Sequence, residues 1–237
     1  MKILVLADIH GRLELLDKVV DKALGEKFDL VICAGNLTDY FDNPLDLEQI
    51  DVADMVVQKL LLLRKPFFCI PGNHDPYEVV DLFENYGINL HDRSKIFNGI
   101  MFVGFGGAQT PFNTVFEPSE EEVADGLDYN SKKAEAGKFI LVVHNPPRDT
   151  KMDKILSGEH VGYKAVRDFI LNKKPLLCIS AHIHEGAGED KLGQTVLFYP
   201  GPVVGGKYGI VEIDGDKVTT EIKSIEIQKQ KNLVGKK

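Results

Sequence analysis

The sequence lacks any apolar run long enough to cross a membrane. Its longest apolar stretches, such as residues 3–7 and 139–143, fall far short of the roughly 20 residues that a transmembrane helix needs. A secretory signal is also not predicted, because one Lys and a short apolar run lead directly to Asp8. We therefore expect a cytoplasmic protein with no membrane partner.

The sequence has no excess of positive charge. Its 28 Lys and Arg residues face 36 Asp and Glu residues, which gives a net charge of −8 at pH 7. A chain with this balance has no electrostatic footprint for long nucleic acid or for an anionic membrane. Any phosphate ligand would therefore need local positive charge, supplied by a metal ion or by a few placed side chains.

Cysteine is scarce as well. Cys33, Cys69 and Cys178 each lie in or beside an apolar run, and no two of them have the spacing of metal ligands. We interpret all three as buried, reduced core residues, with a disulfide or a thiol nucleophile as the second choice.

The rest of the composition is typical of a folded domain. Apolar residues make up 43% of the chain and charged residues 27%, close to the averages for globular proteins. A chain of 237 residues can also bury one core without disulfides. We predict a single domain over residues 1–227 and a short C-terminal tail at 228–237, which is rich in Lys and Gln.

Apolar runs of strand length alternate with segments of helical period through the first two thirds of the chain, as in βαβ units. Strands are expected at residues 3–7, 30–34, 67–70, 139–143, 176–180, 196–198, 208–213 and 218–227, and helices at 13–24, 47–63, 77–86, 119–136 and 162–172. We expect two facing sheets, one begun by βα units and one mostly antiparallel, with helices outside.

Three local signals add detail to this pattern. Asn98-Gly99 predicts a turn within an antiparallel meander over residues 88–107, and Asp214-Gly215 predicts a hairpin. Ser119 followed by Glu122 indicates a capped helix start.

Five of the seven histidines directly follow predicted strands, each beside an Asp, an Asn or a second His. They occur in the segments Asp8-Ile-His10, Asn73-His74-Asp75, His144-Asn145 and His182-Ile-His184. The carboxyl ends of strands in α/β sheets are where ligand sites form. Because side chains alternate along a strand, residues at i and i+2 point to one side and are suited to converge. Mixed His, Asp and Asn donors favour divalent ions such as Mn²⁺, Fe²⁺ or Zn²⁺.

The order of these segments resembles the signature of the calcineurin-like metallophosphoesterases. The resemblance rests on Asp8-x-His10, Gly35-Asn36-x-x-Asp39, Gly72-Asn73-His74-Asp75, His144 and Ala181-His182-x-His184. Residues 104–114, 119–122, 144–147, 160–166 and 200–202 are further similar to the predicted phosphoesterases related to the Icc protein. The resemblance extends over nearly the whole chain. It implies an α/β fold, a four-layer αββα sandwich of two facing mixed β-sheets flanked by helices.

The resemblance also implies a site with two divalent metal ions. Mn²⁺ is the first expectation for both ions, and Fe²⁺, Zn²⁺ or Ni²⁺ are alternatives. The first ion would be held by Asp8, His10 and His184, and the second by Asn73, His144 and His182, with position 36 bridging them.

Two acidic residues and one histidine would surround these ligands. His74 would face the phosphate as hydrogen-bond donor or general acid, and Asp75 would favour its protonated form. Asp39 would orient an imidazole ligand from outside the metal shell. His91 and His160 match no ligand position, and we expect them on the surface or in loops. Arg12 is expected to be solvated.

The main departure from the family pattern is Asn36, which stands where the family has Asp. An amide offers one neutral oxygen and an NH₂ group that cannot ligate, and Asp8 would then be the only anionic ligand. We expect one metal position to be weakly occupied and the activity to be reduced. The change of Gly to Ala181 before His182 is mild.

The function implied is hydrolysis of a phosphodiester or phosphomonoester by metal-bound hydroxide. The alternative is a catalytically weak or inactive module that binds a ligand or a protein on the same scaffold. The expected partner is a small phosphoester or phosphate, without long nucleic acid, and a homo-oligomer is left open.

Overall fold

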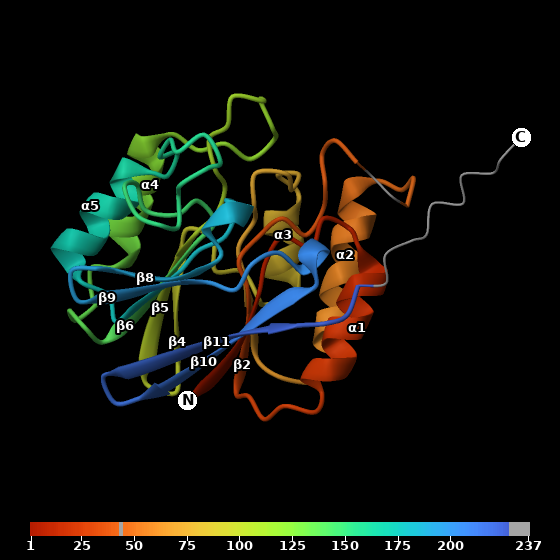
Figure 1. The fold of residues 1–237 in the computed structure, drawn as a ribbon, viewed down its shortest axis with the longest axis horizontal. Coiled ribbons are helices and arrows are strands. Elements are labelled where there is room, and N and C mark those ends of the chain that lie inside the picture. The colour runs from red at the N-terminus through yellow and green to blue at the C-terminus, as the bar shows by residue number, and fades with distance from the viewer. Residues whose placement is uncertain (43–44, 228–237) are drawn as a thin grey trace, which may run out of the picture.

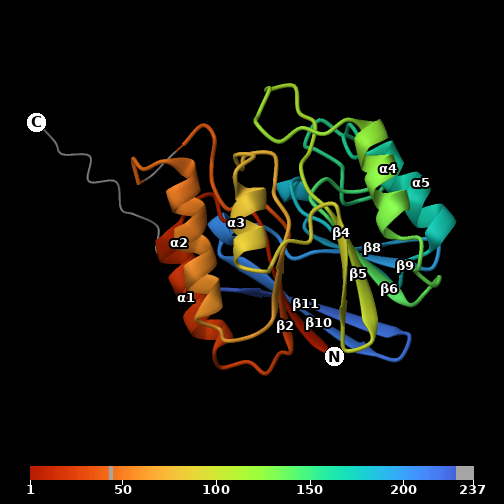
Figure 2. The ribbon, with the colours of Figure 1, turned by 180° about the vertical axis from the view of Figure 1, so that it is seen from behind.

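The computed structural model describes residues 1–42 and 45–227. The expected tail at 228–237 lies outside the described residues, as do Asn43 and Pro44. Two β-sheets face each other; helices α1 to α3 cover the outer face of one, and α4 and α5 cover the other (Figure 1, Figure 2). The four-layer αββα fold expected from the sequence is confirmed.

The first sheet has the strand order β11-β10-β1-β2-β3. Its strands are β1 (Lys2–Leu6), β2 (Leu30–Cys33), β3 (Phe67–Cys69), β10 (Lys207–Asp214) and β11 (Lys217–Ser224). Strands β1, β2 and β3 run parallel, because α1 (Leu13–Ala23) and α2 (Gln49–Leu61) carry the chain back between them. The hairpin expected at Asp214-Gly215 is confirmed, since β10 and β11 pair antiparallel up to that turn.

The second sheet has the order β4-β5-β6-β7-β9-β8. Its strands are β4 (Arg93–Phe97), β5 (Ile100–Phe105), β6 (Phe139–Val143), β7 (Leu177–Ile179), β8 (Gly188–Leu192) and β9 (Thr195–Tyr199). The expectation of a mostly antiparallel sheet was wrong, because β5, β6, β7 and β9 pair in parallel. Helices α4 (Glu120–Asn130) and α5 (Lys164–Lys173) act as crossovers here, and only the outer strands β4 and β8 are antiparallel.

The core lies on both sides of the first sheet. Ile3 and Val5 of β1 pack into the core between the two sheets, whereas Leu4 and Leu6 pack with α1, α2 and α3 (Val79–Asn85). This period of two explains why β1 appears in the sequence as a continuous apolar run: both of its faces are buried.

Helix α4 begins where the sequence predicts and ends earlier. Ser119 and Glu122 form a capping box, in which Ser119 Oγ accepts from Glu122 N at 3.2 Å and Glu122 Oε2 accepts from Ser119 N at 2.8 Å. The helix stops at Asn130 instead of residue 136. Lys132 and Lys133 are exposed, so continuing the helix would bury too little apolar surface to compensate for ordering it.

Two edge features complete the sheets. Asn98 and Gly99 both have positive φ, 48° and 77°, and they form the predicted turn between β4 and β5. Strand β8 was missed, because the sequence Gly-Glu-Asp-Lys-Leu forms a partly exposed edge strand with no apolar alternation.

Short 3₁₀ helices occur at His184–Gly186 and Val203–Gly205. Among the described residues, no helix has the length and apolar character needed to span a membrane.

Candidate metal centre

The expected site residues lie in the loops that follow five strands of the two sheets. These loops meet at one edge of the sandwich. After β1, β2, β3, β6 and β7 they supply, in turn, Asp8 and His10, Asn36 and Asp39, Asn73 to Asp75, His144, and finally His182 and His184. The structure therefore brings the predicted residues into one cluster.

Four of the expected ligands have a left-handed backbone conformation. The φ angle is 53° at Asp8, 50° at His10, 55° at Asn36 and 71° at His182. Such angles are uncommon outside glycine and concentrate at functional sites. Because β1 ends at Leu6, Asp8 and His10 approach each other through a tight turn beyond the strand. Strand alternation, the reason we expected for this convergence, was wrong.

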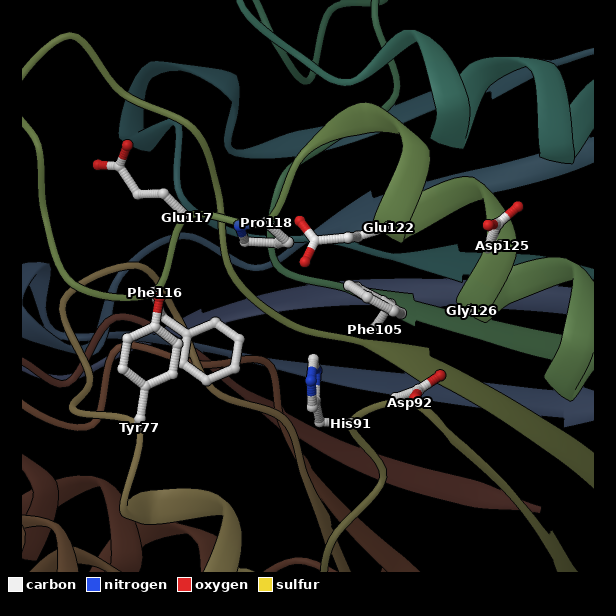
Figure 3. Close-up of a pocket in the computed structure, with 10 residues that line it drawn as sticks. All are labelled: Tyr77, His91, Asp92, Phe105, Phe116, Glu117, Pro118, Glu122, Asp125 and Gly126. Atoms are coloured by element: carbon white, nitrogen blue, oxygen red, sulfur yellow. The ribbon is translucent and has the colours of Figure 1, made fainter.

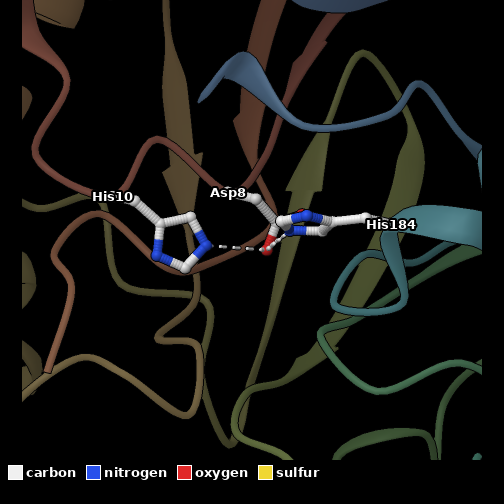
Figure 4. A group of neighbouring side chains, drawn as sticks. All are labelled: Asp8, His10 and His184. Atoms are coloured by element: carbon white, nitrogen blue, oxygen red, sulfur yellow. Dashed lines mark ion pairs between the residues drawn. The ribbon is translucent and has the colours of Figure 1, made fainter. Parts of the chain in front are cut away.

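Asp8, His10 and His184 form one group of potential metal ligands, here termed the Asp8 half-site (Figure 4). One donor atom from each residue lies within 4.8 Å of the others. Asp8 Oδ1 is 4.0 Å from His10 Nε2 and 3.9 Å from His184 Nε2. Ligand atoms that each lie about 2.1 Å from one ion are roughly 3.0–3.5 Å apart. Closing this group around an ion would take a contraction of about 0.5–1 Å at Asp8 Oδ1 and of at most about 2 Å between the two imidazole nitrogens.

Asn73, His144 and His182 form the second group, here termed the His144 half-site. His144 Nδ1 lies 2.7 Å from Ala34 O, and since a carbonyl only accepts, Nδ1 carries the proton. In the neutral ring Nε2 then presents a lone pair, and it faces Asn73 Oδ1 at 3.1 Å. Two acceptors at this distance repel each other, and a cation bound by both would remove that repulsion. The ring of His182 stands beside them, 5.2 Å from that of His144 between centroids.

Burial and nearby charges shift the pKa values of the residues in the two half-sites differently. Burial lowers the pKa of His182 to about 3 and also lowers the pKa of His144, so both rings are neutral near pH 7. Burial opposes ionisation of Asp8, but His184 and the other nearby histidines hold the pKa of its carboxyl well below its usual range. Burial likewise opposes protonation of His184, yet the Asp8 carboxylate raises the pKa of His184 overall. An ion at the Asp8 half-site would therefore compete with a proton on His184.

Two glycines allow the loops to approach this closely. A Cβ atom on Gly35, whose φ is 97°, would lie 2.7 Å from His144 Nδ1 and 2.6 Å from Gly72 N. A Cβ atom on Gly72 would lie 2.1 Å from Asn36 Oδ1. Any side chain at either position would push apart the loops that carry the two half-sites.

Asn36 lies between the half-sites and links them. Its Nδ2 donates to Asp8 Oδ1 at 3.1 Å and to Asn73 Oδ1 at 3.4 Å. Its Oδ1 accepts a hydrogen bond from His74 N at 3.0 Å. The side chain is almost fully buried, with 2% of its surface exposed.

Asp39, and not Asp75, is the carboxylate that contacts His74. Asp39 Oδ1 lies 3.1 Å from His74 Nδ1, and Asp39 Oδ2 lies 3.2 Å from His10 Nδ1. Burial opposes ionisation of Asp39, but His10 and His74 hold its pKa well below its usual range. The expectation that Asp75 acts on the imidazole of His74 was wrong. Both Asp75 oxygens accept hydrogen bonds elsewhere, from Thr38 N and Oγ1 and from Gly72 N.

Tyr199 is a site residue that the sequence analysis missed. Its hydroxyl donates to Asp8 Oδ2 at 2.7 Å, and the tyrosine is fully buried. Burial, together with the Asp8 charge, raises the pKa of Tyr199 well above its usual value, so the phenol keeps its proton. The only signal was its place at the end of a predicted strand, directly before the family-like segment 200–202.

A cavity of about 630 Å³ opens over the cluster. The residues that line it include six from the cluster: His10, Asn36, Asn73, His74, His182 and His184. Apolar residues line it as well, among them Pro111, Phe112, Ile155 and Val161. Arg12 also lines the cavity, although its guanidinium pairs with Asp42. The cluster is therefore accessible to a small molecule that has both a polar and an apolar part.

A second cavity, of about 460 Å³, lies next to α4 and β5 (Figure 3). His91 lines it. We expected this residue on the surface or in a loop, and it lies in the connection between α3 and β4, where its side chain is partly buried. Its Nδ1 accepts from Gly106 N at 2.9 Å, and its ring packs against Phe105 and Phe116. Burial lowers the pKa of His91 to about 4. Several carboxylates also line this cavity, but Glu117, Glu122 and Asp92 already accept hydrogen bonds from neighbouring protein groups.

A comparison with family models shows which family the chain belongs to. A family model described as Calcineurin-like phosphoesterase matches residues 1–186. The chain belongs to this family. The match contains every site residue expected from the sequence, since the last of them is His184.

One curated protein and two solved structures are also similar to this chain. An uncharacterised protein of Methanocaldococcus jannaschii is 32% identical over 209 residues, which cover 85% of this chain and 88% of that protein. Among solved structures, TT1561 of Thermus thermophilus aligns with a TM-score of 0.67 at 21% identity, over 93% of this chain and 97% of that one. A dimetal phosphatase from Danio rerio aligns with a TM-score of 0.67 at 12% identity, over 94% and 96% of the two chains. At these identities the two structures confirm the fold.

Proposed function

We propose that this chain is a metal-dependent phosphoesterase that hydrolyses a small phosphomonoester or phosphodiester, and that Asn36 attenuates its activity. The observation that carries the proposal is the convergence of two donor groups at the floor of one open cavity. Asp8, His10 and His184 offer three donor atoms within 4.8 Å of one another. His144 Nε2 and Asn73 Oδ1 face each other as two acceptors at 3.1 Å.

The donor types of the cluster suit divalent ions, with Mn²⁺ as the first expectation. Imidazole nitrogens mixed with carboxylate and amide oxygens suit Mn²⁺, Fe²⁺ or Zn²⁺. Bound ions would neutralise the phosphate charge and supply an activated water near neutral pH. The fold shared with the Danio rerio dimetal phosphatase agrees with this proposal.

His74 is the proposed proton donor to the leaving oxygen. Its Nδ1 lies 3.1 Å from Asp39 Oδ1 and 3.2 Å from Tyr40 N, so this edge of the ring is engaged by the protein. Because His74 lines the cavity, its Nε2 is the atom that reaches a substrate. Asp39 and the backbone N–H of Tyr40 thus hold the ring in one orientation.

The cavity favours a small substrate. The phosphate would lie against the histidines of the cluster, and the esterified group would contact apolar lining residues such as Phe112 and Ile155. The net charge of −8 disfavours a long nucleic acid, because such a ligand would meet repulsion beyond the site itself.

Attenuation follows from the charge of the site. Two dications about 4 Å apart repel by roughly 16 kcal/mol at an effective dielectric constant of about 20. Asp8 is the only carboxylate among the seven proposed ligands, so the protein offsets little of this repulsion. An Asp at position 36 would add a second negative charge at the bridging position.

The test is hydrolysis of an aryl phosphomonoester and an aryl phosphodiester with excess Mn²⁺. We expect slow hydrolysis by the wild type that a chelator abolishes, and at least tenfold faster hydrolysis by Asn36→Asp, which corresponds to about 1.4 kcal/mol of barrier. Adding His74→Ala to Asn36→Asp should slow hydrolysis of these aryl esters less than that of the corresponding alkyl esters, because an aryl oxide leaves with little help from a general acid. His184→Ala should abolish hydrolysis. The matched control His160→Ala should not, because His160 pairs with Asp153 and belongs to no group of potential metal ligands among the described residues.

One result would overturn the proposal. If Asn36→Asp binds two ions and both esters remain intact, the scaffold is not acting as a phosphoesterase on small esters. The alternative function, a module that binds a ligand or a protein, would then be favoured.

A further inference from the structure

We infer that this chain holds one divalent ion and not two, in the Asp8 half-site, because Asn36 presents its amide nitrogen to the space between the half-sites. The inference rests on the proposed function for the existence of a metal centre. It concerns how many ions that centre holds and where.

A backbone group determines the orientation of the Asn36 amide. The N–H of His74 can only donate, so the Asn36 atom that it meets at 3.0 Å is the acceptor Oδ1. The amide nitrogen then faces Asp8 Oδ1 at 3.1 Å and Asn73 Oδ1 at 3.4 Å, and both of these oxygens are acceptors. The reverse orientation would set N–H against N–H at His74 and oxygen against oxygen at Asp8. All three contacts therefore agree on one orientation.

Asn36 also lacks room to move aside. It is 2% exposed, and a Cβ atom on Gly72 would lie 2.1 Å from its Oδ1 and 2.3 Å from its backbone nitrogen. The backbone of Gly72 therefore packs directly on both the side chain and the main chain of Asn36. A bound ion would have to be accommodated by turning the amide over in place.

This orientation opposes a bridged pair of ions. A bridging ligand must direct oxygen lone pairs at both cations, whereas the NH₂ group directs hydrogens that carry partial positive charge. If the amide turned over to offer its oxygen, the N–H of His74 would lose its acceptor and face a second donor. A single ion in one half-site does not require that change.

Charge selects the Asp8 half-site for that ion. Asp8 is the only carboxylate among the ligands proposed for the two half-sites, and its Oδ2 accepts a hydrogen bond from the Tyr199 hydroxyl at 2.7 Å. Its Oδ1 keeps a second lone pair for an ion beside the bond from Asn36. The His144 half-site has only the neutral donors of Asn73, His144 and His182, so it binds a dication more weakly.

The first test uses the unmodified full chain, freed of metal and titrated with Mn²⁺. We expect one tightly bound ion per chain and the electron paramagnetic resonance spectrum of an isolated Mn²⁺. Two tightly bound ions with an exchange-coupled spectrum would overturn the inference. Because neither readout needs a substrate, a chain that binds one ion and hydrolyses nothing would overturn the proposed function and support this inference.

Two substitutions test the position of the ion. His184→Ala should weaken Mn²⁺ binding at least tenfold, whereas His182→Ala should change it less than threefold. The reverse order would place the ion in the His144 half-site and overturn the assignment.

Asn36→Asp tests whether the Asn36 amide is the reason that the centre holds one ion. We expect it to bind two ions with an exchange-coupled spectrum. Without metal it should melt below the wild type, because a carboxylate replaces the donor 3.1 Å from Asp8 Oδ1, and with excess Mn²⁺ it should melt above it. Gln109→Glu adds the same charge on the exposed rim of the cavity and should keep one ion. A second ion in Gln109→Glu, or a metal-free Asn36→Asp as stable as the wild type, would overturn the role of the amide.

Discussion

Tyr199 donates its hydroxyl to Asp8 Oδ2 at 2.7 Å, although the two residues are 191 positions apart. The bond joins the end of β9 in the second sheet to the loop after β1 in the first sheet. Asp8 Oδ2 also lies 3.4 Å from His182 N. With Oδ2 engaged in this way, Oδ1 is the oxygen left to face His10 and His184, so Tyr199 orients the one anionic ligand of the centre.

We predict that Tyr199→Phe weakens Mn²⁺ binding by about tenfold or more, because an outer-shell partner of a ligand typically contributes that much. The measurement is calorimetric titration of the metal-free protein. Tyr208→Phe is the matched control: Tyr208 is equally buried, and its hydroxyl has no hydrogen-bond partner among the described residues. The control should bind Mn²⁺ as the wild type does. Equal affinities in both variants would contradict the role given to Tyr199.

Asp39→Asn should slow hydrolysis and shift its pH profile, with little change in KM. The reason is that Asp39 contacts His10 and His74 with its two oxygens, and Asn removes the negative charge from beside both rings. The measurement is kcat and KM from pH 5 to 9 in the Asn36→Asp background.

Asp75→Asn is the matched control for Asp39→Asn. Since Asp75 accepts hydrogen bonds from Thr38 and Gly72, its substitution should lower the free energy of unfolding by about 1–3 kcal/mol and leave the shape of the pH profile unchanged. A shifted profile in this variant would restore the direct role first expected for Asp75.

The effect of His74→Ala should depend on the leaving group. A general acid typically contributes about 10²–10⁴-fold when the leaving alkoxide is a poor one. An aryl oxide leaves with little help, so its ester should be affected much less. Rates for a series of alkyl and aryl esters would measure this dependence at constant metal content, and a uniform loss across the series would argue against proton donation by His74.

His91 should make the metal-free protein less stable in mild acid. Its pKa is lowered to about 4 in the fold by burial, whereas an ordinary imidazole has a value near 6.5. Between these values the unfolded chain binds a proton that the folded chain does not, so the free energy of unfolding falls as the pH falls, by at most about 1.4 kcal/mol per pH unit for one proton.

His91→Asn should remove this part of the slope. An Asn side chain can still accept from Gly106 N, the donor that His91 Nδ1 now binds, but it does not titrate. Denaturant unfolding with a chelator present, from pH 7 to pH 4, would compare the slopes of the two proteins. Identical slopes would show that His91 does not carry this effect.

The local patterns of the sequence predicted most elements but not how they pair. The strand at Phe139–Val143 and the turn at Asn98-Gly99 depend on short-range preferences, and both are present as predicted. Strand β8 is polar and lies at an edge, so the apolar periodicity of the sequence does not indicate its pairing with β9. The parallel centre of the second sheet was also missed, because strand direction depends on where each crossover returns the chain.

By itself, the sequence determined the fold class and which loops carry the metal-binding residue types. Both depend on strand-end motifs and apolar periodicity, which involve residues that are close together in the sequence. Only the tertiary structure decided which partner each group meets. It assigned Asp39 and not Asp75 to His74, brought Tyr199 to Asp8, and set the Asn36 amide nitrogen between the half-sites. Such contacts join residues from 28 to 191 positions apart, and they depend on how the loops of two sheets meet, which local spacing does not encode.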